Sequence, residues 1–248
     1  MANTLYSLST SHPALAARAM LDHKGIEYRV VSVVPGMHPP FLRLRGFRGK
    51  TIPALVIDGR RVQGSREISR VLDEVRPDPP LFPSDPEARG RVEDAERWGD
   101  EILQDVPRRI NRWIFANSYE ARRWLAVDAS GVPLGGVLAR PPFQAKAFAK
   151  GSGATDEAVQ ADIAGLRDTL DRVQALRDEA VIGGDQPNAA DFQIASSLRS
   201  LAGIADLAPY IAGHPAIQWS ATVVPDLPGS TPSALPREWL KVLEREPA

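Results

Sequence analysis

The stretch Lys50–Leu72, with the sequence KTIPALVIDGRRVQGSREISRVL, constrains the fold more than any other part of the chain. Residues 54–57 form an apolar run that ends at the turn pair Asp58-Gly59, and a second run follows at residues 61–63. Two short runs joined by such a pair are typical of a tight β-hairpin. The stretch therefore predicts two adjacent antiparallel strands.

Both ends of this hairpin carry further signals. Pro53 cannot donate to a β-ladder, and its bond with Ile52 is of the kind that becomes cis at modest cost. After the hairpin, Gly64-Ser65 opens a predicted helix with Ser65 placed to cap it. The apolar positions of that helix recur at helical spacing: Ile68, Val71, Leu72 and Val75. Proline, hairpin and capped helix together predict a thiol-binding domain of the thioredoxin type.

The residues before this stretch complete the predicted domain. Asn3–Leu8 and Tyr28–Val34 read as strands, and Ala14–Lys24 reads as a helix that ends at Gly25. Ser11 is a predicted N-cap of that helix, because the following proline suits a first turn. Residues 41–47 predict a short irregular helix. The expected order is βαβαββα, a four-stranded mixed sheet between helices.

A proline-rich segment divides the chain. We predict a thioredoxin-like domain at residues 1–76, a linker at 77–86 and an all-helical domain at 87–248. The expected helical segments are residues 92–115, bent at Pro107, then 119–127 and 155–180, with a loop at 131–142. Asn188 and Asp191 match the logic of a capping box at the start of another helix. The role we expect for Asp191 is structural.

Composition excludes several classes of function. A formal net charge of −1 argues against nucleic acid or an anionic membrane as the main partner. No apolar run is long enough for a membrane span and no secretory signal is visible, so a cytoplasmic location is expected. The chain contains no cysteine, which excludes disulfides, thiolate metal sites and a cysteine nucleophile. Any thiol used here must arrive with a ligand.

The motif at residues 52–65 resembles the second half of the N-terminal domain of glutathione transferases, in which a cis-proline enters the hairpin and a serine opens the next helix. Gly183-Gly184-Asp185-Gln186-Pro187, with the capping box that follows, is similar to the start of that family's central helix. The resemblance covers about the first 205 residues and leaves 128–155 and the C-terminal tail unexplained. It is to bacterial, serine-type, theta- and zeta-like members. It implies glutathione as cosubstrate, a small electrophile as partner, no metal, a homodimer and a role in detoxification.

The chemistry that this resemblance implies is to hold a thiol as its anion near neutral pH. A free thiol has a pKa of about 8.5, and a hydroxyl that donates to the sulfur contributes about 1.5–3 kcal/mol. This corresponds to a shift of about one to two pH units. Ser11 stands at the position of the catalytic serine in serine-type members, and Ser9 is the second candidate. Tyr6 would correspond to the tyrosine-type classes but falls inside the first strand.

Six residues are candidates for holding glutathione. Ile52 can offer its backbone N–H and C=O to an extended peptide, and Ser65 stands at a helix N-terminus, where anions bind. The resemblance assigns a carboxylate contact to His38, with Lys50 as the alternative. The other two candidates are Pro53 and Gln63.

One position departs from the family pattern. Gly64 replaces the Glu or Gln that holds the γ-glutamyl amino group in the family. Three readings stay open: Gln63 substitutes for it, an acid of a partner subunit does, or the natural thiol is not glutathione.

Other polar residues are given structural readings. His12, beside Ser11, reads as a surface residue, with a catalytic base as the alternative, and His23 and His214 read as surface residues. A cluster of arginines reads as a solvated face, with contact to an acidic substrate as the alternative: Arg108, Arg109, Arg112, Arg122 and Arg123.

The sequence therefore predicts an enzyme that activates a thiol for addition to a small hydrophobic electrophile. The alternatives are a non-catalytic ligand-binding or protein-interaction module, and a glutathione-dependent isomerase or reductase.

Overall fold

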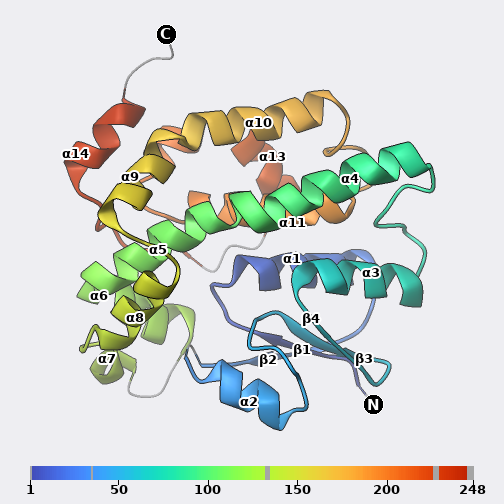
Figure 1. Ribbon diagram of the computed structural model, residues 1–248, viewed down its shortest axis with the longest axis horizontal. Coiled ribbons are helices and arrows are strands. Elements are labelled where there is room, and N and C mark those ends of the chain that lie inside the picture. The colour runs from blue at the N-terminus through green and yellow to red at the C-terminus, as the bar shows by residue number, and fades with distance from the viewer. Residues whose placement is uncertain (1, 35, 132–134, 226–228, 245–248) are drawn as a thin grey trace.

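The computed structural model describes residues 2–34, 36–131, 135–225 and 229–244, and shows a small sheet followed by a set of helices (Figure 1). The N-terminal elements are β1 (Thr4–Ser7), α1 (His12–His23), β2 (Arg29–Ser32), α2 (His38–Leu44), β3 (Ala54–Ile57), β4 (Arg60–Gln63) and α3 (Ser65–Val75). Their order is βαβαββα, which confirms the predicted fold class.

The sheet has the order β2-β1-β3-β4, with β1 parallel to β2 and antiparallel to β3. Successive side chains point to opposite faces of a strand. Leu5, Leu55 and Ile57 therefore pack in the core shared with α1 and α3, whereas Tyr6 and Ala54 pack on the face near α2. Figure 1 shows α1 and α3 between the sheet and the other helices, and α2 on the far side.

The turn residues follow the prediction, with one correction. Asp58 and Gly59 have φ values of 48° and 79°, the two positive values that a type I′ hairpin turn requires. Gly25, with a φ of 60°, ends α1. The prediction that Ser65 caps α3 is wrong: Gly64 is the N-cap, and Ser65 is the first helical residue.

The second half of the chain is helical. Its larger elements are α4 (Pro86–Trp98), α5 (Asp105–Asn117), α6 (Tyr119–Trp124), α8 (Phe143–Gly151), α9 (Asp156–Ala164), α10 (Leu166–Asp178), α11 (Ala189–Ala202) and α13 (Pro215–Val223). Shorter pieces are π-helical turns at Gly99–Leu103 and Leu125–Ala129, α7 (Gly135–Leu138), α12 (Ala208–Ile211), α14 (Arg237–Leu240) and a 3₁₀ turn at Lys241–Leu243. Within the described ranges, no helix has both the length and the apolar character needed to cross a bilayer.

Two segments that were each predicted to form one helix are divided in the structure. The segment 92–115 is interrupted by the π-helical turn Gly99–Leu103 and not at Pro107. Pro107 lies in the first turn of α5, where a missing N–H is tolerated. The segment 155–180 is two helices that meet at Gly165. In the predicted loop 131–142, residues 132–134 lie outside the described part of the chain, and Gly135–Leu138 forms α7.

The predicted capping box at the start of α11 is confirmed. The Asn188 side chain accepts from the N–H groups of Ala190 and Asp191, and the Asp191 carboxylate accepts from Asn188 N–H at 2.7 Å. The same carboxylate also accepts from Gly183 N–H at 2.6 Å. Burial raises the pKa of Asp191 to about 6, while these two N–H donors and Arg177 act in the opposite direction. Asp191 thus ties the preceding loop to a buried helix.

One hydrophobic core continues through both halves of the chain. The segment between α3 and α4 has neither helix nor strand, and its Leu81 and Phe82 are buried in this core. Leu81 N–H donates to the Asp73 carboxylate at 2.7 Å, and Leu81 C=O accepts from Ala189 N–H at 2.9 Å. The segment is therefore fastened to α3 on one side and to α11 on the other.

Replacing Asp191 by alanine should destabilise the protein strongly. The change leaves two N–H groups without their acceptor, and each such group costs about 1–3 kcal/mol when buried. We expect the free energy of unfolding to fall by about 2–5 kcal/mol in urea denaturation. Asp185→Ala, at an exposed acid six positions earlier, should change it by about 0.5 kcal/mol or less. Equal effects of the two substitutions would contradict this role.

Candidate functional site

A cavity of about 460 Å³ lies between the two halves of the chain. The N-terminal half contributes residues 8–13, Leu15, His38 and residues 50–52, and the helical half contributes Pro107, Arg108, Asn111, Arg112, Trp124, Ser196, Ser200, Gly203, Gly229 and Thr231. Five of the predicted site residues line it: Ser9, Ser11, His38, Lys50 and Ile52. Pro53, Gln63 and Ser65 are not among its lining residues.

Ser11 lies between β1 and α1, directly before the first residue of α1. Its extended backbone makes it the N-cap, and its Oγ accepts from Ala14 N–H at a long 3.4 Å. A hydroxyl that accepts in this way still has its own proton to donate into the cavity. Ser9 Oγ instead lies 3.0 Å from Ser130 Oγ at an exposed position. Tyr6 is buried against Phe41 and Phe47, away from the cavity.

The segment before Pro53 lines the same cavity as these serines. Its bond with Ile52 is cis, as the resemblance implied. The segment is held by Gln63, whose side chain accepts from Gly49 N–H at 2.7 Å and donates to Thr51 C=O at 3.1 Å. Both ends of the Gln63 amide are therefore used inside the protein. Gln63 therefore supports the segment that lines the cavity, and its role as a ligand-binding residue stays a prediction.

The prediction that His12 is a surface residue is wrong. His12 is the first residue of α1, is 7% exposed, and its Nδ1 has no hydrogen-bond partner among the described residues. Burial, together with the nearby Arg108 and Arg112, lowers the pKa of His12 from 6.5 to about 3. The imidazole is therefore neutral at physiological pH.

His38 also borders the cavity, and it does not belong to an exposed loop. It is the first residue of α2, it is half-buried, and its Nδ1 lacks a partner among the described residues. Burial, and after it the charge of Arg112, lowers the pKa of His38. Both histidines thus present neutral rings to the cavity at neutral pH.

The arginine cluster of α5 and α6 divides into two groups. Arg109 forms two hydrogen bonds with Asp162, at 2.7 and 2.6 Å, and Arg122 donates to four backbone carbonyls. Arg123 is exposed near Asp128. Arg108 and Arg112 instead line the cavity, so the prediction of a solvated face is wrong for these two.

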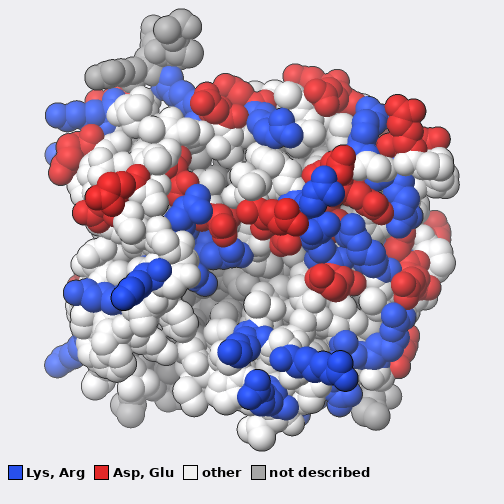
Figure 2. Space-filling view, in the orientation of Figure 1, with Lys and Arg blue, Asp and Glu red and all other residues white. Residues whose placement is uncertain are grey.

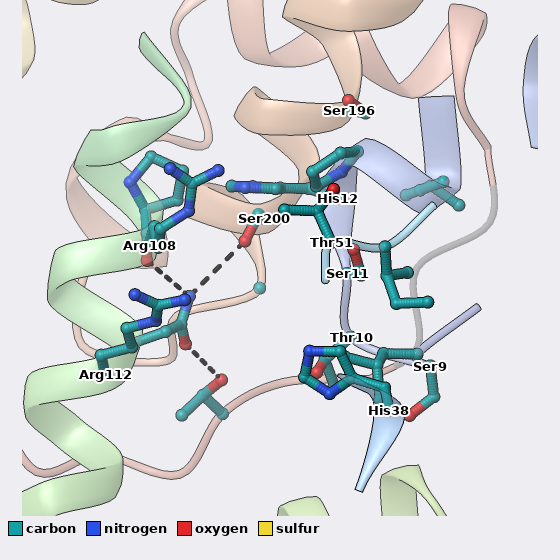
Figure 3. A pocket seen from close by; sticks show the side chains of 18 of the residues that line it. Ser9, Thr10, Ser11, His12, His38, Thr51, Arg108, Arg112, Ser196 and Ser200 are labelled. Atoms are coloured by element: carbon teal, nitrogen blue, oxygen red, sulfur yellow. Dashed lines mark hydrogen bonds between the residues drawn. The ribbon is translucent and has the colours of Figure 1, made fainter. Parts of the chain in front are cut away.

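Sequence reasoning missed the contribution of α11 and of the C-terminal tail. Thr231 pairs with the end of α11 through its backbone, with Thr231 N–H donating to Gly203 C=O at 2.7 Å. Its hydroxyl donates to Asn111 Oδ1 at 2.9 Å, and Asn111 Nδ2 lies 3.5 Å from Ser200 Oγ (Figure 3). The tail therefore closes one wall of the cavity, a long-range contact with no local sequence signal.

The charged side chains that line the cavity are all positive. Its charged lining residues are Lys50, Arg108 and Arg112, and no Asp or Glu belongs to the described lining. Figure 2 shows the molecule hollowed between its two halves, with Lys and Arg gathered over α2 and the neighbouring hairpin. The sequence explains this, since no acid occurs between Glu27 and Asp58. Such a lining favours anionic ligands.

Comparison with known families identifies the N-terminal domain. The family model described as "Glutathione S-transferase, N-terminal domain" matches residues 5–80. Residues 5–80 belong to the glutathione S-transferase family. The resemblance drawn from the sequence is therefore confirmed, while the serine-type, theta- or zeta-like subclass stays a prediction. No curated protein matches the sequence.

Solved structures extend the likeness to the whole chain. A glutathione S-transferase from Rhodospirillum rubrum has a TM-score of 0.64 and 21% identity, covering 97% of this chain and 99% of its own. One from Sinorhizobium meliloti has a TM-score of 0.64 and 19% identity, covering 98% and 99%. One from Methylobacterium radiotolerans has a TM-score of 0.52 and 20% identity, covering 96% and 99%. The chain thus has the glutathione S-transferase fold.

The departure from the family pattern at Gly64 has a structural explanation. Gly64 has a φ of 92°, a backbone conformation that favours glycine. A Cβ at this position would lie 2.2 Å from Glu67 Oε2, so the Glu67 carboxylate occupies the space that a side chain of residue 64 would enter. An acid is therefore present beside this position, although it comes from the next turn of α3.

Replacing His12 should change how stability depends on pH. Since the folded-state pKa is about 3 and the unfolded value 6.5, the unfolded chain binds a proton in this window that the folded chain does not. Stability therefore falls as pH decreases through this window. We expect His12→Gln, which cannot be protonated, to lose less Tm than the wild type between about pH 7 and about pH 5. Because the pKa values of His23 and His38 are also lowered, only the difference between the two proteins reports on His12. An equal loss in both would show that the folded protein accommodates a charged His12.

Proposed function

We propose that the protein is a glutathione transferase-like enzyme that binds a thiol, with glutathione the expected one, and activates its sulfur for addition to a small electrophile. The observation that supports this most directly is a juxtaposition: the Ser11 hydroxyl, at the start of α1, and Ile52, before cis-Pro53, open on one cavity. The Methylobacterium radiotolerans structure, which has this fold, was solved with glutathione sulfonate.

In the proposed mechanism, the peptide of the thiol lies against the backbone of Ile52 and its sulfur lies at Ser11. The Ser11 hydroxyl donates to the thiolate while it accepts from Ala14 N–H. This bond contributes about 1.5–3 kcal/mol, and the N-terminus of α1 adds about 0.3–1 kcal/mol. Together they lower the thiol pKa by about one to three units, which is enough to ionise most of the bound thiol near neutral pH. The thiol proton leaves to water when the sulfur ionises. The sulfur then forms a bond with the electrophilic carbon while the π bond at that carbon breaks, and the electron pair of that bond moves to the adjoining atom, which takes up a proton from water.

The remaining ligand contacts follow from the same placement. Lys50 and His38 line the cavity near Ile52, where they can bind a carboxylate of the tripeptide. Glu67, which fills the space beside Gly64, is the proposed acceptor for the γ-glutamyl amino group. The alternatives stay that Gln63 or an acid of a partner subunit supplies the acceptor, or that the natural thiol is not glutathione. A homodimeric state, a cytoplasmic location and a role in detoxification stay predictions of the resemblance.

Removing the Ser11 hydroxyl should impair conjugation. We expect Ser11→Ala to lower kcat/KM for glutathione and an aryl halide by at least about tenfold, and to shift its pH profile upward by about one to two units. Ser118→Ala is the matched control, because Ser118 caps α6 in the same way but does not line the cavity. Ser9→Ala separates the two candidate serines. If Ser9→Ala shows the large loss and Ser11→Ala does not, the catalytic assignment moves to Ser9; if neither does, the mechanism is wrong.

Removing the Glu67 carboxylate should weaken the binding of a thiol that carries an amino group. An exposed ion pair contributes up to about 1 kcal/mol, so Glu67→Ala should raise KM for glutathione by up to about fivefold. The KM for N-acetylglutathione, which lacks the ammonium group, should not respond. Glu74→Ala removes an exposed acid from the same helix and serves as the control. Equal KM changes for both thiols would exclude Glu67 as the acceptor.

A further inference from the structure

Two cations face the proposed thiol site from the opposite wall of the cavity. Arg108 and Arg112 are four residues apart on α5, so they project from the same side of that helix. Figure 3 shows them across the cavity from Ser9, Ser11 and His38. This is the wall that a second substrate would contact once a thiol lies against Ser11.

The two arginines differ in whether their charge is compensated. Arg108 donates to the Asp105 carboxylate, which also lies 3.7 Å from Arg109. Within the described ranges, no acid stands at ion-pair distance from Arg112. Asp105 lies two turns away from Arg112 and acts on it only at longer range. Of the two lining arginines, Arg112 is therefore the one without a counterion at ion-pair distance among the described residues.

Neighbouring polar groups do not satisfy Arg112 either. Asn111 Nδ2 donates to Pro107 C=O at 3.0 Å and lies 3.5 Å from Ser200 Oγ, while Asn111 Oδ1 accepts from Thr231. The rings of His12 and His38 are neutral and carry no negative charge. Burial, and after it the charge of Arg108, lowers the pKa of Arg112, but a guanidinium stays protonated in proteins. A half-buried cation of this kind is stabilised when an anion binds it.

From this geometry we propose that the second substrate is an electrophile with a carboxylate, and that Arg112 binds this carboxylate as a specificity-determining residue. The inference deepens the proposed function and rests on it for the reaction, but the anion site itself can be tested without catalysis. A guanidinium presents parallel N–H donors that match the two oxygens of a carboxylate. The bound electrophile would then have its reactive carbon directed toward the sulfur at Ser11.

A matched pair of aryl halides tests this. Chlorodinitrobenzoate carries the carboxylate, and chlorodinitrobenzamide is its neutral counterpart. In both, the thiolate sulfur bonds to the ring carbon that bears chlorine, the carbon–chlorine bond breaks with its electron pair on chloride, and the thiol proton goes to water. We expect wild-type kcat/KM to favour the acid, after correction for the uncatalysed rates. Arg112→Gln should lower the acid-to-amide ratio of kcat/KM by about tenfold or more.

Two further variants control this measurement. Arg97→Gln removes an exposed cation of α4 outside the cavity and should leave the ratio unchanged. Arg112→Lys keeps the charge but not the paired donors, so its ratio should fall between those of the wild type and Arg112→Gln. Because no acid of the described residues forms an ion pair with Arg112, Arg112→Gln should keep or raise Tm. If Arg112→Gln nevertheless fails to fold, Arg112→Lys decides the question, and a wild-type ratio in that variant overturns the proposal.

A binding experiment without thiol separates the two proposals. Calorimetry with the unreactive pair dinitrobenzoate and dinitrobenzamide should show tighter binding of the acid, and Arg112→Gln should weaken the acid by about tenfold. If this dependence on Arg112 is observed while neither aryl halide is conjugated, the anion site stands and the transferase function is wrong. If the acid binds no better than the amide, or if Arg112→Gln leaves the preference unchanged, the anion site is overturned whatever the conjugation assays show.

Discussion

The buried Asp191 carboxylate is the contact on which much of the architecture depends. It receives the N–H groups of Gly183 and Asn188 and so fixes where α11 begins. That helix is buried along most of its length, and it packs against α1, α4, α5 and α13. It also supplies Ser196 and Ser200 to the cavity. The Asp191 side chain thus positions α11, which packs against the N-terminal domain through α1 and forms part of the cavity wall.

Parts of the fold and site with a local cause could be predicted from the sequence. The Asp58-Gly59 turn and the capping box at Asn188 are each set by the conformational preference of a few neighbouring residues. The N-cap position of Ser11 is of the same kind. These local features, together with the family resemblance, were sufficient to place Ser9, Ser11, His38, Lys50 and Ile52 at one site.

Several features that the sequence did not reveal have a common cause, since they concern side chains whose surroundings come from distant parts of the chain. The contact of the Gln63 amide with the loop at Gly49 and Thr51 is one of them. His12 and Arg112 look like surface residues on their own helices, yet both line the cavity between the two halves of the chain. The π-helical turn of the α4–α5 segment lies where Gly99 packs against Gln193 and Ile194, and its sequence alone gives no sign of that contact.

The buried segment between α3 and α4 has a consequence for how the cavity is entered. A chain that joins two domains often acts as a hinge, but here Leu81 and Phe82 would have to leave the hydrophobic core before the halves could swing apart. The hydrogen bonds that the Leu81 backbone forms with Asp73 and Ala189 would have to break at the same time. The buried segment and its hydrogen bonds therefore form a frame that opposes a widening of the cavity mouth. For a molecule that enters the cavity, such a frame favours a fit by shape and charge over one that needs the two halves to open.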